Sequence, residues 1–286
     1  ALHDLLGTVL FNNKKDLKAA EVELKKATQL DRNNSDAFVK LGQVQFAMGS
    51  ADEAIATYEQ SIKDNPREVS FYILAGELYE SKKDMAKARQ MYQKALDIQP
   101  DNALASNNLA YVMLEEGGNI DVALSMAQNA RRSMPDSPNA ADTLGWAYYQ
   151  KGAYNTAIDL FKEAMKKRPD DATLNYHIGM AYLKSDQQSL ARQHLERVLK
   201  INPNYAKGDD VRKALAQCVA AVDACSKPEV ERFARCIILR VAQWALDGRR
   251  TVPAIGEVRQ MLVEFCAEMI AGMRDLRNEV GEGAVP

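Results

Sequence analysis

The cysteines and histidines are the side chains best suited to metal binding or nucleophilic chemistry, and their spacing argues against both. The three histidines, His3, His177 and His194, lie outside the stretch that holds the cysteines, which are Cys218, Cys225, Cys236 and Cys266. Structural zinc sites take such ligands in closely spaced pairs, and no such pair occurs. All the cysteines but Cys225 have apolar neighbours, so we expect buried, reduced thiols and no metal site.

The remaining candidates for catalysis are better explained as structural signals. Asp170 and Asp171 follow Pro169 at a junction between two predicted helices, where an acidic side chain caps the helix that follows. Gly117 and Gly118 lie in a predicted turn and lack the other residues of a phosphate-binding loop. We therefore expect a protein that is not an enzyme and has no cofactor.

The elements that carry these residues recur along the chain. Helical patterns of about one length are closed by prolines at steps of 34, 35, 34 and 34 residues, namely Pro66, Pro100, Pro135, Pro169 and Pro203. The clearest unit, residues 138–171, consists of two helical patterns joined by a turn at Gly152. A fixed period in this range is the signature of a repeat array, in which each unit buries its apolar face against its neighbours.

Small residues also recur at fixed places within the units. The first helix of each unit has a small residue after an apolar one, at Gly7, Gly42, Gly76, Ala110, Gly145 and Gly179. The second helix has an alanine, at Ala20, Ala54, Ala88, Ala123, Ala157 and Ala191. Four places later comes a bulky side chain in most units, as at Tyr58, Tyr92, Phe161 and Leu195. Small residues let two antiparallel helices approach closely, and the bulky residue fills the space between units.

This pattern resembles the tetratricopeptide repeat, in its bacterial type, over residues 1–205. The departures are Arg32 where the family prefers proline, one extra residue in the turn between Glu115 and Ile120, and Ala127 at a bulky place. The resemblance implies an all-α, right-handed solenoid of six helix–turn–helix units. Their approximate bounds are 1–34, 35–68, 69–102, 103–137, 138–171 and 172–205.

The resemblance also implies a binding surface, because first helices of the family line a concave groove that receives extended peptides or partner helices. The corresponding places hold Asn107, Asn108, Tyr111, Asp142, Trp146, Tyr149, Tyr176, His177 and Met180. Aromatic rings supply contact area, and amides can bond a peptide backbone. The alternative for Trp146 and Tyr149 is that they pack between helices. Family members that bind chaperone C-termini use a clamp of lysine, asparagine and arginine, whose places here include Val39 and Ile73, so that role is disfavoured.

Beyond residue 205 the period stops. We expect a capping helix at 206–225, which covers the last apolar face of the array, and a helical hairpin at 226–286. Both helices of the hairpin are apolar on more than one side, which favours a second neighbour from another copy. The predicted contact residues for a homo-oligomer through 226–278 are Phe233, Ile237, Val241, Trp244, Val258, Leu262, Phe265 and Met269. The alternative is that the hairpin folds back on the capping helix.

Composition changes in this tail as well. From Gln217 onward the chain has one lysine against eight arginines, and all the cysteines lie there. Drift within one gene explains this, and so does a tail acquired from a different protein by fusion or by engineering.

Charge and hydropathy limit the partners. The formal net charge is −2 with charges mixed along the chain, whereas nucleic-acid binders usually have a basic stripe. No apolar run is long enough to span a bilayer, so we expect neither nucleic acid nor membrane insertion. Reduced-type cysteines favour the cytoplasm. Ala1 already lies inside the first predicted helix, so we expect a fragment, and an exported parent remains an alternative.

Two functions follow from the sequence. The first is a non-catalytic scaffold that binds a peptide or helix of a protein partner in the concave groove. The second is a self-assembling oligomer, natural or engineered, in which the hairpin joins copies and the solenoid is a structural arm.

Overall fold

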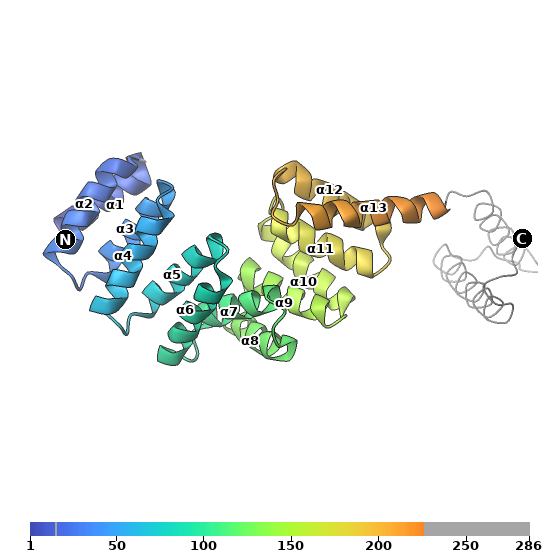
Figure 1. The fold of residues 1–286 in the computed structure, drawn as a ribbon, viewed down its shortest axis with the longest axis horizontal. Coiled ribbons are helices and arrows are strands. Elements are labelled where there is room, and N and C mark those ends of the chain that lie inside the picture. The colour runs from blue at the N-terminus through green and yellow to red at the C-terminus, as the bar shows by residue number, and fades with distance from the viewer. Residues whose placement is uncertain (15, 226–286) are drawn as a thin grey trace, which may run out of the picture. The chain divides into compact units, whose positions relative to one another are not determined.

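The computed structural model describes residues 1–14 and 16–225, and every regular element in these ranges is a helix (Figure 1). This confirms the predicted all-α fold. The α-helices are α1 Leu2–Val9, α2 Leu17–Leu30, α3 Ser35–Ala47, α4 Ala51–Asp64, α5 Val69–Ser81, α6 Met85–Ile98, α7 Ala103–Glu115, α8 Ile120–Ser133, α9 Pro138–Gln150, α10 Tyr154–Lys167, α11 Ala172–Lys184, α12 Gln188–Ile201 and α13 Gly208–Cys225. A π-helical segment, Leu10–Lys14, follows α1.

The helices are paired and stacked as a repeat array requires. Each odd-numbered helix from α1 to α11 packs against the helix that follows it, and each second helix packs against the first helix of the next unit. First helices of neighbouring units also touch, as α7 and α9 do. The units therefore share a continuous core, and the first helices together form one face, which we call the first-helix face.

Glycines set the distance between the two helices of a unit. A Cβ atom on Gly76 would lie 2.5 Å from the Tyr92 ring, and one on Gly145 would lie 2.6 Å from the Phe161 ring. Both rings are fully buried. Any larger residue at these two glycines would push the helices apart, which explains the repeated pairing of glycine with a bulky residue.

The fourth unit departs from this pairing, and the structure shows how it compensates. Ala110 and Ala127, at the corresponding places of α7 and α8, are both fully buried. Because Ala110 already adds a methyl group where other units have glycine, the small Ala127 opposite keeps the helices close. In α3, the polar side chain of Gln45 is also buried, at 4% exposure, and its oxygen accepts a hydrogen bond from Thr57 Oγ1 at 2.7 Å.

Polar side chains cap the N-termini of the helices, and a residue with a left-handed backbone conformation follows the first helix of most units. Asn102 Oδ1 accepts from Ala105 N at 2.9 Å, and Asp171 Oδ1 accepts from Thr173 N at 2.9 Å and from Leu174 N at 3.0 Å. The capping role predicted for Asp171 is confirmed. Gly152, in the turn after α9, has a φ of +81°, which glycine adopts without steric cost.

The chain forms two compact units, Ala1–Ala214 and Leu215–Pro286, and the division falls inside α13. Helix α13 begins at Gly208, and Val211 and Ala214 on its first turns are buried. The predicted hairpin at 226–286, with its contact residues, lies outside the described residues. Within 1–14 and 16–225, no helix is both long and apolar enough to cross a bilayer.

Candidate protein-binding face

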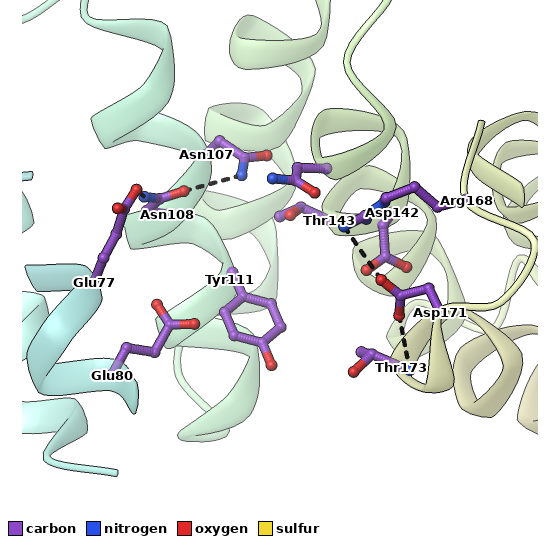
Figure 2. A pocket seen from close by; sticks show the side chains of 11 residues that line it. Glu77, Glu80, Asn107, Asn108, Tyr111, Asp142, Thr143, Arg168, Asp171 and Thr173 are labelled. Carbon is purple, nitrogen blue, oxygen red and sulfur yellow. Dashed lines mark hydrogen bonds and ion pairs between the residues drawn. The ribbon is translucent and has the colours of Figure 1, made fainter. Parts of the chain in front are cut away.

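A cavity of about 280 Å³ opens on the first-helix face (Figure 2). Its lining comes from α5, α7, α9 and α11 and from the junction between α10 and α11, and most of it is polar. We call it the acidic cavity. It is lined by Glu77, Glu80, Asn107, Asn108, Tyr111, Asn139, Asp142, Thr143, Arg168, Asp171 and Thr173.

One wall of the acidic cavity is a chain of hydrogen bonds that runs from α7 to α5. Asn107 Nδ2 donates to Asn108 Oδ1 at 3.2 Å, and Asn108 Nδ2 donates to Glu77 Oε1 at 3.3 Å. Asn107 is only 3% exposed, and its Oδ1 atom has no hydrogen-bond partner among the described residues. This wall therefore ends in a buried acceptor that has no hydrogen-bond partner within the described chain.

Glu80 extends the same wall toward α6. Tyr92 in α6 donates its hydroxyl to Glu80 Oε2 at 3.1 Å. Burial is the main cause that raises the pKa of Glu80 to about 7. The hydrogen bond from Tyr92 opposes this rise, and the nearby Glu77 and Glu115 carboxylates add smaller contributions to it. Glu80 is therefore partly protonated near neutral pH.

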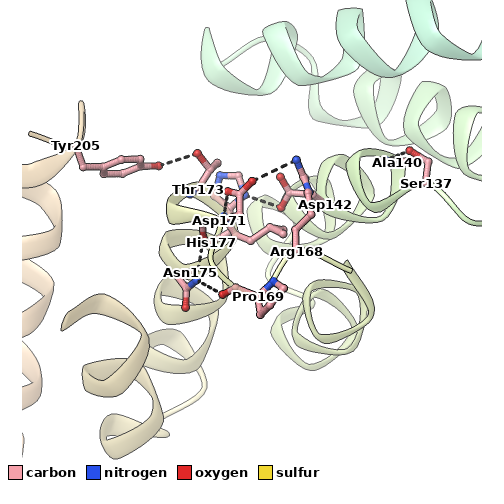
Figure 3. Close-up of polar contacts among 11 residues, drawn as sticks. Ser137, Ala140, Asp142, Arg168, Pro169, Asp171, Thr173, Asn175, His177 and Tyr205 are labelled. Carbon is pink, nitrogen blue, oxygen red and sulfur yellow. Dashed lines mark hydrogen bonds and ion pairs between the residues drawn. The ribbon is translucent and has the colours of Figure 1, made fainter. Parts of the chain in front are cut away.

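The opposite wall holds acidic side chains that already have partners within the chain (Figure 3). Arg168 Nη1 lies 3.2 Å from Asp171 Oδ2, and His177 Nδ1 lies 2.8 Å from Asp142 Oδ1. Arg168 Nε is buried without a hydrogen-bond partner in the part of the chain that the structure describes. The wall thus offers one open donor beside acidic groups that already have partners.

Next to the acidic cavity lies an aromatic cluster made of Trp146, Tyr149, Tyr176, His177 and Tyr205. The Trp146 ring stacks on Tyr149, with centroids 4.6 Å apart, and on His177, with centroids 4.1 Å apart. Trp146 is 6% exposed and His177 1% exposed. These rings pack between α9 and α11, which is the alternative that the sequence left open for Trp146.

A lysine from the segment before α13 lies over this aromatic cluster. Lys207 Nζ lies 2.7 Å from Glu115 Oε2 in α7, 5.6 Å from the Trp146 ring centroid and 5.4 Å from that of Tyr176. Tyr205 donates its hydroxyl to Thr173 Oγ1 at 3.4 Å, as Figure 3 shows. An ammonium group is therefore held by one carboxylate and two rings on the first-helix face.

The residues predicted for the groove fall into two groups. Asn107, Asn108, Tyr111 and Asp142 line the acidic cavity, and Asp142 also bonds a member of the aromatic cluster. Trp146, Tyr149, Tyr176 and His177 form the aromatic cluster. Met180 belongs to neither set. The predicted site is thus split into a polar part that lines the cavity and an aromatic part that packs between helices.

Several residues of this face were not predicted as site residues. Glu80 and Arg168 lie at positions that the repeat pattern assigns to helix ends, and Lys207 follows the last unit. The signal that the sequence offered was the pair of glutamates on α5, Glu77 and Glu80, which lie one turn apart. Within the described residues, no group of three or more His, Cys, Asp or Glu side chains could hold a metal ion.

Family models for the tetratricopeptide repeat match residues 39–103 and 172–205, and a TPR repeat model matches residues 145–186. Among curated proteins, the chain is 25% identical over 193 residues to BBSome complex member BBS4 of Bos taurus, covering 68% of this chain and 37% of that protein. It is 22% identical over 209 residues to the peroxisomal targeting signal receptor of Eremothecium gossypii, covering 71% of this chain and 35% of the receptor.

The fold is also found in solved structures. In the crystal structure of the APC/C hetero-tetramer Cut9–Hcn1, one chain superposes with a TM-score of 0.63 and 21% identity, covering 74% of this chain and 42% of that one. This likeness shows the solenoid fold alone. The chain spans well under half the length of both curated relatives.

Proposed function

Because the chain belongs to the tetratricopeptide repeat family, we propose that it is a protein-interaction scaffold that binds a peptide or helix of a partner protein on its first-helix face. Its contribution is recognition, without chemistry of its own. Relatives named as a complex member and as a targeting signal receptor support this class of function. The identity of the partner is not implied by these names.

The observation that carries the proposal is the acidic cavity. It opens on the face formed by successive first helices, and side chains of four such helices converge in it. A buried amide oxygen without a partner lies in its wall, at Asn107. Buried polar groups in folded proteins are normally paired, so an open one in a cavity favours a ligand that supplies the missing donor.

The proposal is tested by selecting binders from a random dodecapeptide library displayed on phage. Asn108→Ala combined with Tyr111→Phe removes polar atoms from the cavity, and we expect selected peptides to bind this variant at least about tenfold more weakly. The matched control carries Glu53→Gln and Asp159→Asn, which change exposed side chains of α4 and α10 away from the cavity. Peptides that bind the variant and the control equally well would contradict the proposal.

Self-assembly through residues 226–278 remains the alternative function, and it rests on the apolar pattern of the tail. Absolute mass by light scattering tests it on the full chain. A defined dimer or larger species would favour it, and a monomer would contradict it.

A further inference from the structure

We infer that the acidic cavity binds the side chain of a lysine or arginine from a basic peptide. This inference rests on the proposed function and names the chemistry of the partner. It is carried by the direction of the hydrogen bonds in the cavity wall, by the balance of charges around it and by the way the chain already holds its own Lys207.

The hydrogen bonds fix which atoms of the wall are open. Glu77 can only accept when ionised, so Asn108 must turn its Nδ2 atom toward it, at 3.3 Å. Asn108 Oδ1 then faces Asn107, which must turn its own Nδ2 atom toward Asn108, at 3.2 Å. The Asn107 Oδ1 atom is left as an acceptor, turned toward the α9 side of the cavity in Figure 2. A ligand that satisfies it must be a donor.

The charges select a positive donor. Of the charged residues that line the cavity, Asp171 pairs with Arg168, and Asp142 pairs with His177. Glu77 and Glu80 have no lysine, arginine or histidine nitrogen within 4 Å in the described part of the chain. Two carboxylates and a buried amide oxygen on one wall match an ammonium or guanidinium group, which offers several donors and a positive charge.

Lys207 shows that the same face holds an ammonium group. Its Nζ atom lies 2.7 Å from Glu115 Oε2 and within 6 Å of the Trp146 and Tyr176 rings. Glu115 lies on α7, one turn beyond Tyr111, which lines the cavity. The position next to the acidic cavity is thus filled by a basic side chain of the chain itself, whereas the cavity is open.

The size of the cavity favours a single side chain. Pockets that bury a whole small molecule measure roughly 300–1,000 Å³. At about 280 Å³, the acidic cavity falls just below that range. Arg168 stands on the opposite wall with its buried Nε atom open, where a carbonyl oxygen of the peptide backbone can accept. One basic side chain and its backbone therefore use both walls.

The test uses peptides from the dodecapeptide selection and measures their affinity for the full chain by fluorescence anisotropy. We expect the selected peptides to share a lysine or arginine. Replacing that residue by glutamine should weaken binding roughly ten- to hundredfold, because hydrogen bonds to charged groups are lost. Glu77→Gln combined with Glu80→Gln should weaken binding of the original peptide by a similar factor. The control Glu53→Gln with Asp159→Asn removes the same two charges elsewhere and should leave affinity within about twofold.

The outcomes separate this inference from the proposed function. Peptides that lose affinity for the Asn108→Ala, Tyr111→Phe variant but contain no essential lysine or arginine would overturn the inference and leave the proposed function standing. A library that yields no binder at all would overturn both. Circular dichroism of each variant checks that it is folded. Salt screens interactions between charges, so an affinity that decreases when the salt concentration is raised from 0.05 to 0.5 M supports the charged contact.

Discussion

The acidic cavity and the aromatic cluster lie side by side on the first-helix face, and they satisfy their polar atoms in different ways. In the aromatic cluster, the chain supplies its own cation, since Lys207 lies over two rings and bonds Glu115. In the acidic cavity, the Glu77 and Glu80 carboxylates and the Asn107 oxygen have no cationic partner among the described residues. The cluster therefore has its cation within the chain, although Trp146 Nε1 is buried without a hydrogen-bond partner among the described residues, whereas we propose that the cavity takes its cation from a ligand.

This difference separates stability from binding. Stacked, buried rings contribute mainly to the free energy of unfolding, because they remove apolar area from water and leave little of it open to a partner. Desolvated carboxylates without a cation lower stability and gain most when a ligand arrives. Substitutions in the aromatic cluster should therefore lower mainly the free energy of unfolding, whereas substitutions in the acidic cavity should lower mainly the affinity for a ligand.

The largest expected effect on stability comes from Trp146→Ala. Trp146 is 6% exposed and stacks on Tyr149 and His177, so its truncation leaves a void and should lower the free energy of unfolding by about 3–5 kcal/mol. Urea unfolding followed by circular dichroism measures this. The control is Phe46→Ala in α3, where the ring is 48% exposed and the loss should stay below about 1 kcal/mol. Equal losses for both variants would remove the distinction between cluster and surface.

Glu80→Gln should raise the free energy of unfolding, whereas Trp146→Ala should lower it. The folded-state pKa of Glu80 is about 7 against a usual 4.5, so the folded protein favours the protonated form. The protonated Glu80 therefore contributes its full share to the free energy of unfolding below about pH 4.5. This contribution is lost as the pH rises through 7, because the folded protein must then bury an ionised carboxylate. Glutamine keeps an acceptor for Tyr92 without the charge that Glu77 and Glu115 repel. We expect the variant to exceed the wild type by about 1–3 kcal/mol at pH 8 and to match it near pH 4.5.

Urea unfolding at pH 4.5 and pH 8 checks this prediction. Glu53→Gln, at an exposed residue of α4, is the control and should leave the pH dependence of the unfolding free energy as in the wild type. A Glu80→Gln variant that is less stable than the wild type at pH 8 would show that the ionised carboxylate is already well compensated within the chain.

A smaller loss is expected from Lys207→Ala. The substitution removes a partly exposed ion pair with Glu115 and the contacts with the Trp146 and Tyr176 rings, which together contribute about 1 kcal/mol. Thermal unfolding at low and moderate salt measures it. Lys167→Ala, which breaks an exposed pair with Asp136, should cost less than about 0.5 kcal/mol. If Lys207→Ala leaves thermal unfolding unchanged, the stability of the aromatic cluster does not depend on Lys207.

The smallest effect on stability is expected from Asn107→Ala. Its oxygen has no partner, so truncation removes an unpaired buried atom together with one bond to Asn108, and the net change should stay within about 1 kcal/mol. The comparison is Asn175→Ala, another buried asparagine, whose side chain bonds Pro169 O, Asp171 O and His194. That variant should lose about 2–3 kcal/mol in urea unfolding. If Asn107→Ala and Asn175→Ala lower the free energy of unfolding equally, the Asn107 oxygen already has a partner, and the idea of an unpaired acceptor is contradicted.

The sequence predicted the repeat units because their signals are local and repeated. Closing prolines, glycine opposite a bulky residue, and polar caps such as Asp171 recur at one period, and the structure contains the helices they predict. Even the departure at Ala127 follows a local rule once it is read together with Ala110. The helix boundary after the last unit was predicted less accurately, since α13 begins at Gly208 and the capping helix was predicted from residue 206.

The site was predicted only in part, because its contacts join residues far apart in sequence. First-helix positions identified Asn107 and Asn108, but the pattern could not show that the buried His177 stacks on Trp146. Nor could it place Lys207 against Glu115, 92 residues away, since that contact depends on how the stack of units turns. Local periodicity gives the helices and their faces, and the arrangement of the units decides which side chains meet.

The measurement that tests the central claim most directly is a nitrogen-15 correlation spectrum of the full chain during titration with Nα-acetyl-arginine methylamide. We expect saturable shifts of the Asn107 and Asn108 side-chain amide signals, absent with the acetyl-glutamine analogue and absent in the Glu77→Gln, Glu80→Gln variant. Amide signals that stay unchanged, or that move equally with both analogues, would contradict the claim that the acidic cavity binds a basic side chain.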